Sequence, residues 1–192
     1  DYTERNIYKS IRPTSKGLFL TDTIVGGRLD VRDYQIYLKP KNNNLAIGTR
    51  INSASTGTNN LVFSVSGLSA NTTGECNIGI GANVLKVNTT GNKNLAIGVN
   101  ALTANTTGNE NISIGKDTLK LSTISTENIA IGNGVLSSIQ TSDTTKGNKN
   151  VAIGDESMKT STIGIGNVAV GTNSLKLSST GDYNIGVGYE AG

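Results

Sequence analysis

The residues of this chain that could take part in chemistry are carboxylates and lysines, because histidine is absent and cysteine occurs once. Without histidine, Ser-His-Asp and Cys-His mechanisms and His-based metal sites are excluded. The single Cys76 cannot form a disulfide within the chain, and we interpret it as a small residue accepted in a turn. These observations predict no catalytic residue, no metal ligand and no cofactor.

The carboxylates of residues 44–192 are scattered over the chain. Glu75, Glu110 and Glu127 precede similar segments but are separated in sequence, and we interpret them as solvated. Cleavage of a glycosidic bond needs two carboxyl groups held at a fixed separation. No spacing in the sequence selects such a pair, so the chain is not predicted to be an enzyme, and a carbohydrate-cleaving fibre is kept as an alternative.

A five-residue motif, Asn-aliphatic-small-aliphatic-Gly, recurs along residues 44–192. The structure that this motif forms must position the carboxylate and lysine side chains. Successive motifs begin 16, 17, 17, 17, 17, 22, 17 and 17 residues apart. A period this short and regular is typical of a solenoid of stacked coils. Stacking would place the recurring Asn side chains above one another in a ladder. The predicted Asn ladder comprises Asn44, Asn60, Asn77, Asn94, Asn111, Asn128, Asn150, Asn167 and Asn184.

The motif reads as a short strand whose side chains alternate between two faces. We predict that the large aliphatic residues at its second and fourth positions face the inside of the coil. The third residue is small in nearly every copy, which suggests that a neighbouring chain approaches this face closely. The predicted inter-chain face comprises Ala46, Gly79, Ala96, Ser113, Ala130, Ala152, Ala169 and Gly186.

Three further features complete the predicted coil. An apolar residue eight positions after the Asn, such as Leu102, should close the core from a second short strand. The glycine that ends the motif, such as Gly98, should make the first corner, and a turn such as Asn105–Gly108 should use its glycine for a positive φ. The longer spacing after Asn128 predicts a surface loop within 137–146.

Residues 1–43 form a different unit. They carry eight of the 17 basic and five of the 14 acidic residues, whereas residues 44–192 are neutral. The basic residues are interspersed with acids, so we expect no nucleic-acid footprint. We predict an extended arm at 1–13 and a small β cap or connector at 14–43 that covers the first open edge of the solenoid.

Composition limits the core and the compartment. Apolar residues make up 35% of the chain, and about three large aliphatics per coil give a thin core, so association between chains is a plausible source of stability. No segment approaches the roughly 18 consecutive apolar residues of a membrane span. The chain begins at Asp1 and ends within a repeat, and we interpret it as a processed or excised piece that is truncated at its C-terminus.

The segments N-L-A-I-G at Asn94 and N-V-A-I-G at Asn150, with the Ala-Leu pair and the T-T-G turn that follow, resemble the YadA-like head repeats of trimeric autotransporter adhesins and of phage and viral tail fibres. The resemblance covers residues 44–192. It implies a left-handed parallel β-roll of about nine coils and a homotrimer, in which the small residues would form the trimer face.

The resemblance also implies a role. We expect a structural or adhesive trimeric fibre segment of a virus or phage that serves host attachment or forms a shaft. It would be joined to a larger particle through residues 1–43 and lie at the virion surface, without nucleic-acid binding or membrane insertion. A bacterial adhesin head at the cell surface is the alternative. Candidates for contact with a host glycan or protein receptor are Tyr183, Tyr189 and the 137–146 loop.

Overall fold

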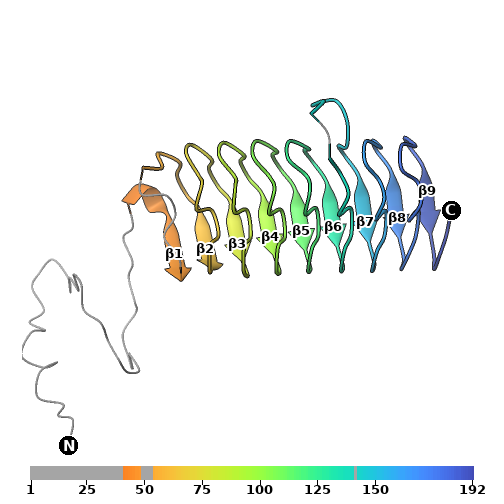
Figure 1. Ribbon diagram of the computed structural model, residues 1–192, viewed down its shortest axis with the longest axis horizontal. Helices are drawn as coiled ribbons and strands as arrows, with labels where there is room; N and C mark the ends of the chain where they lie inside the picture. Colours follow the sequence, from red (N-terminus) through yellow and green to blue (C-terminus); the bar gives the residue numbers. More distant parts are fainter. Residues whose placement is uncertain (1–40, 49–53, 141) are drawn as a thin grey trace, which may run out of the picture. The chain divides into compact units, whose positions relative to one another are not determined.

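The computed structural model describes residues 41–48, 54–140 and 142–192, which form an all-β solenoid. Nine short parallel strands make one sheet, and their order in the sheet is their order in the chain (Figure 1). A 3-10 turn, η1, precedes them. The elements are η1 Lys41–Asn43, β1 Leu45–Gly48, β2 Leu61–Ser64, β3 Ile78–Ile80, β4 Leu95–Ile97, β5 Ile112–Ile114, β6 Ile129–Ile131, β7 Val151–Ile153, β8 Val168–Val170 and β9 Ile185–Val187.

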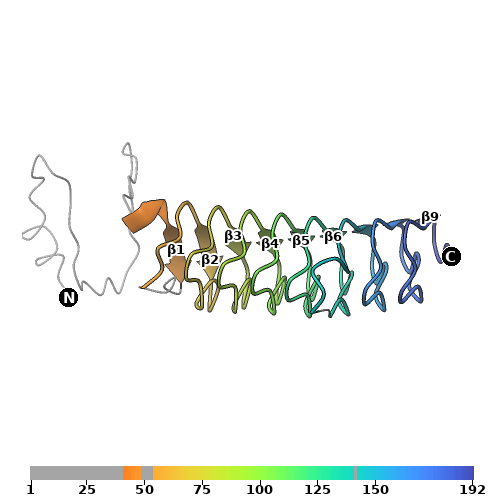
Figure 2. The same cartoon turned by 90° about the horizontal axis from the view of Figure 1, so that it is seen from above.

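The strands pair in the register that the motif predicts. Leu95, Ala96 and Ile97 of β4 stand opposite Ile112, Ser113 and Ile114 of β5. Equivalent residues of successive coils therefore lie side by side along the array, and the coils follow one another at even intervals (Figure 2). The predicted parallel β-solenoid is confirmed. We name each coil by its Asn and number its positions from that Asn as position 1.

The chain divides into two units, Asp1–Tyr37 and Leu38–Gly192. The predicted arm at 1–13 and nearly all of the predicted cap at 14–43 lie outside the described residues. Only Lys41–Asn43 of that segment is described, and it is a 3-10 turn with Asn42 at φ 58°.

The strands are oriented opposite to the prediction. Position 3 faces the interior of the coil, where Ala96, Ala130, Ala152 and Ala169 are fully buried. Positions 2 and 4 face outward, as in β5, where Ile112 and Ile114 are partly exposed on either side of the buried Ser113. Every residue of the predicted inter-chain face is buried within its own chain except Ala46, which is exposed in β1. These residues therefore cannot form the surface that another chain contacts.

The interior is too narrow for a large residue at both position 3 and position 8, which face each other across it. A Cβ on Gly79 would lie 2.9 Å from Cγ2 of Val84, and a Cβ on Gly67 would lie 2.9 Å from Cγ1 of Val62. Both coils thus pair one valine with one glycine. The valine is at position 3 in one coil and at position 8 in the other. Position 3 is small because position 8 of the same coil packs against it, and no second chain is needed to explain it.

The apolar row at position 9 is buried, as predicted, but it lies in a turn and not in the predicted second strand. Its members are fully buried except Leu175, which is 7% exposed. Each adopts a left-handed backbone conformation, with φ between 45° and 50°, which is unusual for a bulky residue. Burial of the side chain offsets the backbone strain. The row comprises Leu68, Leu85, Leu102, Leu119, Leu136, Met158 and Leu175.

The two recurrent glycines have different roles. Gly98, which ends the motif, has φ 124° and makes the predicted corner. Gly108 of the Asn-Thr-Thr-Gly turn does not have a positive φ, so that prediction is wrong. It is required for space, because a Cβ there would overlap the carbonyl oxygen of Ser125 in the next coil and Oδ1 of Asn105.

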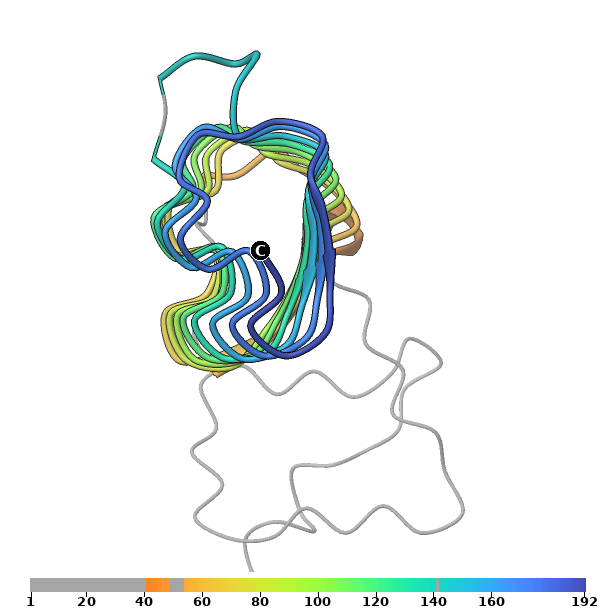
Figure 3. The same ribbon diagram turned by 90° about the vertical axis from the view of Figure 1, so that its right-hand side faces the viewer.

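The predicted surface loop is present and projects from the ring of coils (Figure 3). Ser137 and Ser138 keep their places in the coil, and Ile139 is buried at position 12. Gly147 accepts a hydrogen bond from Asn128 Nδ2, as the position 15 carbonyl does in other coils. The extra residues therefore lie within 140–146, on a different side of the coil from the strands.

Candidate functional site

The predicted Asn ladder is present and runs through the interior at position 1. In the middle of the array, Asn111 Nδ2 donates to Oδ1 of Asn94 at 3.0 Å and to the carbonyl oxygen of Ser125 at 2.8 Å. The backbone N–H of Asn111 donates to the same Asn94 Oδ1 at 3.0 Å. The first bond joins neighbouring coils, and the second closes the Asn111 coil on itself.

The bond between neighbouring coils recurs from Asn60 to Asn184. The Asn side chains are buried except at the two ends, where Asn44 is partly exposed and Asn184 is exposed. An amide suits this position because it offers two donors and an acceptor together. The ladder is therefore the main polar scaffold of the core.

A second, shorter ladder runs through position 12. Asn105 Nδ2 donates to Asn88 Oδ1 at 2.7 Å, and Asn88 Nδ2 donates to Asn71 Oδ1 at 3.1 Å. The ladder ends where Ser122 replaces the amide, and Asn105 Oδ1 has no hydrogen-bond partner among the residues that the structure describes. The sequence indicated only local turn bonds for these residues. The repetition of Asn at one phase was the signal for the ladder.

Burial of both ladders bears on the N-x-[ST] segments of the chain. Asn71, Asn88, Asn105 and Asn111 all begin such segments, and all four are fully buried. A glycan needs an exposed Asn nitrogen, so these positions cannot carry one in the folded array.

The outer sheet face is an extended apolar surface on the described part of the chain, and we call it the aliphatic face. Positions 2 and 4 of every strand contribute to it, and none of these residues is buried. Exposure is 38% at Ile80 and 37% at Ile153, and it rises to 77% at Ile185 in the last strand. The face comprises Leu45, Ile47, Leu61, Phe63, Ile78, Ile80, Leu95, Ile97, Ile112, Ile114, Ile129, Ile131, Val151, Ile153, Val168, Val170, Ile185 and Val187.

The aliphatic face is continuous because the register stacks its residues strand by strand. At about 4.8 Å per strand it is roughly 40 Å long. An exposed apolar patch of this length marks an interaction site on a protein surface. The aliphatic face contains no charged residue. Such a surface fits association with another protein surface.

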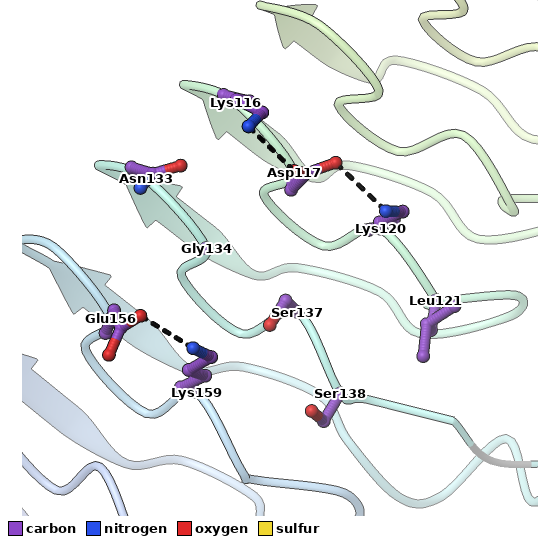
Figure 4. A pocket seen from close by; sticks show the side chains of 10 residues that line it. All are labelled: Lys116, Asp117, Lys120, Leu121, Asn133, Gly134, Ser137, Ser138, Glu156 and Lys159. Atoms are coloured by element: carbon purple, nitrogen blue, oxygen red, sulfur yellow. Dashed lines mark hydrogen bonds and ion pairs between the residues drawn. The ribbon is translucent and has the colours of Figure 1, made fainter.

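A shallow polar depression of about 400 Å³ lies on a different side of the coil (Figure 4). It forms because the Asn128 coil has Gly134, Ser137 and Ser138 where its neighbours carry charged or larger side chains. Asp117 and Lys120 stand on one flank, 3.2 Å apart. Glu156 stands on the other flank with Lys159, 2.6 Å apart.

Both acids at the depression are held in the charged form. A hydrogen bond from Asn100 and the nearby Lys120 lower the pKa of Asp117. Hydrogen bonds from Lys159 and Lys176 lower the pKa of Glu156 to about 2. A general acid for glycoside cleavage needs a raised pKa. Neither carboxylate suits that role, and the depression is a site of ion pairing.

In the part of the chain that the structure describes, no three His, Cys, Asp or Glu side chains gather closely enough to hold a metal ion. Within the same residues no helix has the length and apolarity needed to cross a bilayer. Cys76 is exposed as a free thiol at position 17, with φ 56°. This fits its interpretation as a turn residue.

Comparison of the chain with protein-family models, with curated proteins and with solved structures gave no match.

Proposed function

We propose that three copies of residues 44–192 form a homotrimeric fibre segment at the surface of a virus or phage. This segment serves host attachment or forms a shaft. Residues 1–43 join it to a larger particle. The observation that supports this proposal is the aliphatic face, which an isolated chain leaves exposed along the whole array. The sequence resemblance to YadA-like heads gives the number of chains.

The observed orientation of the strands favours association between chains. Small residues at position 3 would have offered a surface with little area to bury. The aliphatic face offers two rows of Leu, Ile and Val with one Phe, which release far more apolar surface from water on contact. In the proposed trimer the three aliphatic faces surround a common axis, and the polar turns face outward.

A role that is structural and not enzymatic agrees with the charge distribution. The ion pairs of Asp117 and Glu156 keep both carboxylates ionised, which does not favour the alternative of a carbohydrate-cleaving fibre. A bacterial adhesin head would use the same aliphatic face in the same way. The fibre is the reading we prefer because the Ala-Leu pair and the T-T-G turn resemble the phage and viral form of the repeat.

The mass of the native chain in solution tests the proposal. Sedimentation equilibrium should give three times the chain mass of 19.9 kDa, without dissociation at micromolar concentration. A folded species with the mass of one chain would overturn it. A dimer would leave association on the aliphatic face intact but contradict the trimeric fibre.

A further inference from the structure

The projecting loop forms a pocket with its neighbouring coils, from the Asn111 coil to the Asn167 coil. The pocket has a volume of about 420 Å³ and is lined by Thr144 and Thr145 of the loop, by Glu127 and Lys149, and by Ile165 and Tyr183. The sequence offered Tyr183 and the 137–146 loop as separate candidates for receptor contact. The structure brings them to one place.

The loop wall of this pocket is held in a defined shape. Asp143 Oδ1 accepts hydrogen bonds from the N–H of Thr145 at 2.9 Å and from its hydroxyl at 2.7 Å. Asn148 Nδ2 donates to the carbonyl oxygen of Thr144 at 2.7 Å. Asn148 Oδ1 accepts from the N–H of Thr126 in the preceding coil at 2.8 Å. The loop is thus tied at its tip and at its base, so Thr144 and Thr145 are presented in fixed positions.

An aromatic ring that contacts the array along one edge forms another part of the pocket lining. Tyr183 lies at position 17 of its coil, and its neighbour along the array at that position is Gly166. A Cβ on Gly166 would lie 2.8 Å from Cδ1 of Tyr183 and 2.9 Å from its Cε1. The Cδ1–Cε1 edge of the ring therefore lies against the Gly166 backbone, since Cγ would be 3.9 Å from the same Cβ, and Tyr183 as a whole remains 77% exposed. This contact leaves most of the ring surface open to a ligand.

The floor of the pocket carries charges that are available to a ligand. Glu127 and Lys149 occupy position 17 of adjacent coils, and both are exposed. Among the described residues neither takes part in an ion pair, whereas Lys93 and Glu110, at the same position of earlier coils, lie 2.8 Å apart. The two charges cancel, so the pocket favours neither a polyanion nor a polycation.

We infer that this pocket binds one pyranose unit of a carbohydrate, stacked on Tyr183. A pyranose has an apolar C–H face, which fits the open ring face of Tyr183 beside Ile165. It also has a rim of hydroxyls, which fits the Glu127 carboxylate, the Lys149 ammonium and the threonine hydroxyls. The volume is within the range of small-molecule sites. The biological role of this sugar site rests on the proposed function in host attachment. The pocket itself is formed by a single chain, so sugar binding does not require the trimer.

Saturation-transfer NMR on the full chain tests the inference, with the methyl pyranosides of galactose, glucose and mannose as probes at millimolar concentration. We expect transfer to the C–H face of at least one probe. Tyr183→Ala should weaken binding by about three- to tenfold, the range expected for a stacked ring. Gly166→Ala should also weaken it, because the added Cβ displaces the ring.

Tyr189→Ala is the matched control, because Tyr189 is 72% exposed in the next coil but does not line the pocket. It should bind as the native chain does. Absence of transfer for every probe, or equal loss in the Tyr183 and Tyr189 variants, would overturn the site. Because the mass of the assembly is measured separately, failure of the sugar site and failure of the trimer are distinguishable.

Discussion

Gly79 faces Val84 across the interior of one coil, so closely that a Cβ on Gly79 would lie 2.9 Å from Val84 Cγ2. In the preceding coil the valine is on the strand side and the glycine is opposite, as Val62 and Gly67. Other coils satisfy the same constraint differently. Ser113 and Thr118 use two small hydroxyl residues whose oxygens lie 2.6 Å apart. The pair, and not the single position, is therefore the unit of core packing.

Exchanging the two residues of this pair should restore stability that each single change removes. Gly79→Val should destabilise by about 1–3 kcal/mol through overpacking. Val84→Gly should destabilise through an unfilled interior. The double variant should be at least about 1 kcal/mol more stable than the sum of the two single effects predicts, because it recreates the Val62–Gly67 arrangement. Urea denaturation of all four chains measures this coupling, and additive effects would contradict the packing argument.

The Asn ladder should reject aspartate. In Asn111→Asp, both bonds that Nδ2 donates would become oxygen–oxygen contacts, to Asn94 Oδ1 and to the Ser125 carbonyl. We expect a loss of about 3–5 kcal/mol at neutral pH, since a charge is buried with its neighbouring acceptors unsatisfied. A shift in the denaturation midpoint measures it.

Asn109→Asp is the control for the ladder prediction. Asn109 Oδ1 accepts a bond from the N–H of Asn92, and Asp182 accepts the equivalent bond from Ile165 at the same position of a later coil. An acceptor alone is sufficient there, so this substitution should be tolerated. Equal destabilisation by both substitutions would show that the ladder is not specific for an amide.

The Glu156 ion pairs should give the array a measurable acid sensitivity. Their hydrogen bonds lower the pKa of Glu156 from 4.5 to about 2, so their contribution is present above about pH 4.5 and is lost as the pH falls towards 2. Glu156→Gln should lower the melting temperature at pH 7 but have little effect near pH 2 or in molar salt. Melting curves that differ equally at both pH values would contradict this assignment.

The sequence was sufficient to predict most of the fold. The fixed phase of the Asn motif predicts the strands, the stacking, the buried row represented by Leu102 and the ladder, because each follows from a period of about 17 residues. The surface loop follows from one longer spacing.

The direction of the strands could not be predicted in the same way. Alternation along a three-residue strand separates Ala96 from Leu95 and Ile97, but it does not say which side is inside. Large aliphatic residues usually face a core. Here the coil is so narrow that the large aliphatic residues of the strand do not fit inside. The size of the residue that fits at position 3 depends on the residue at position 8. The exchanged volumes of Val62–Gly67 and Gly79–Val84 were the available signal, but they are informative only once positions 3 and 8 are known to be partners.

The pocket between the projecting loop and Tyr183 could not be predicted from the sequence either. Tyr183 and Thr144 are far apart in sequence, and their proximity arises because the loop projects beside later coils. The sequence identified both segments but gave no reason to join them.

Two neighbouring residues of β4 test the central claim, which is that the aliphatic face joins the chains while the small residues fill each core. Ala96→Glu should place a charge in the narrow interior and unfold the surrounding coils. Ile97→Glu should leave the fold intact and prevent association. Thr107→Glu, an exposed position away from the strands, is the control for the added charge and should do neither.

Sedimentation velocity combined with circular dichroism on these variants is the most direct measurement. We predict a folded single chain for Ile97→Glu, an unfolded chain for Ala96→Glu, and a folded trimer for both the native protein and Thr107→Glu. A folded trimer of Ile97→Glu would contradict the account, as would a folded single chain of Ala96→Glu.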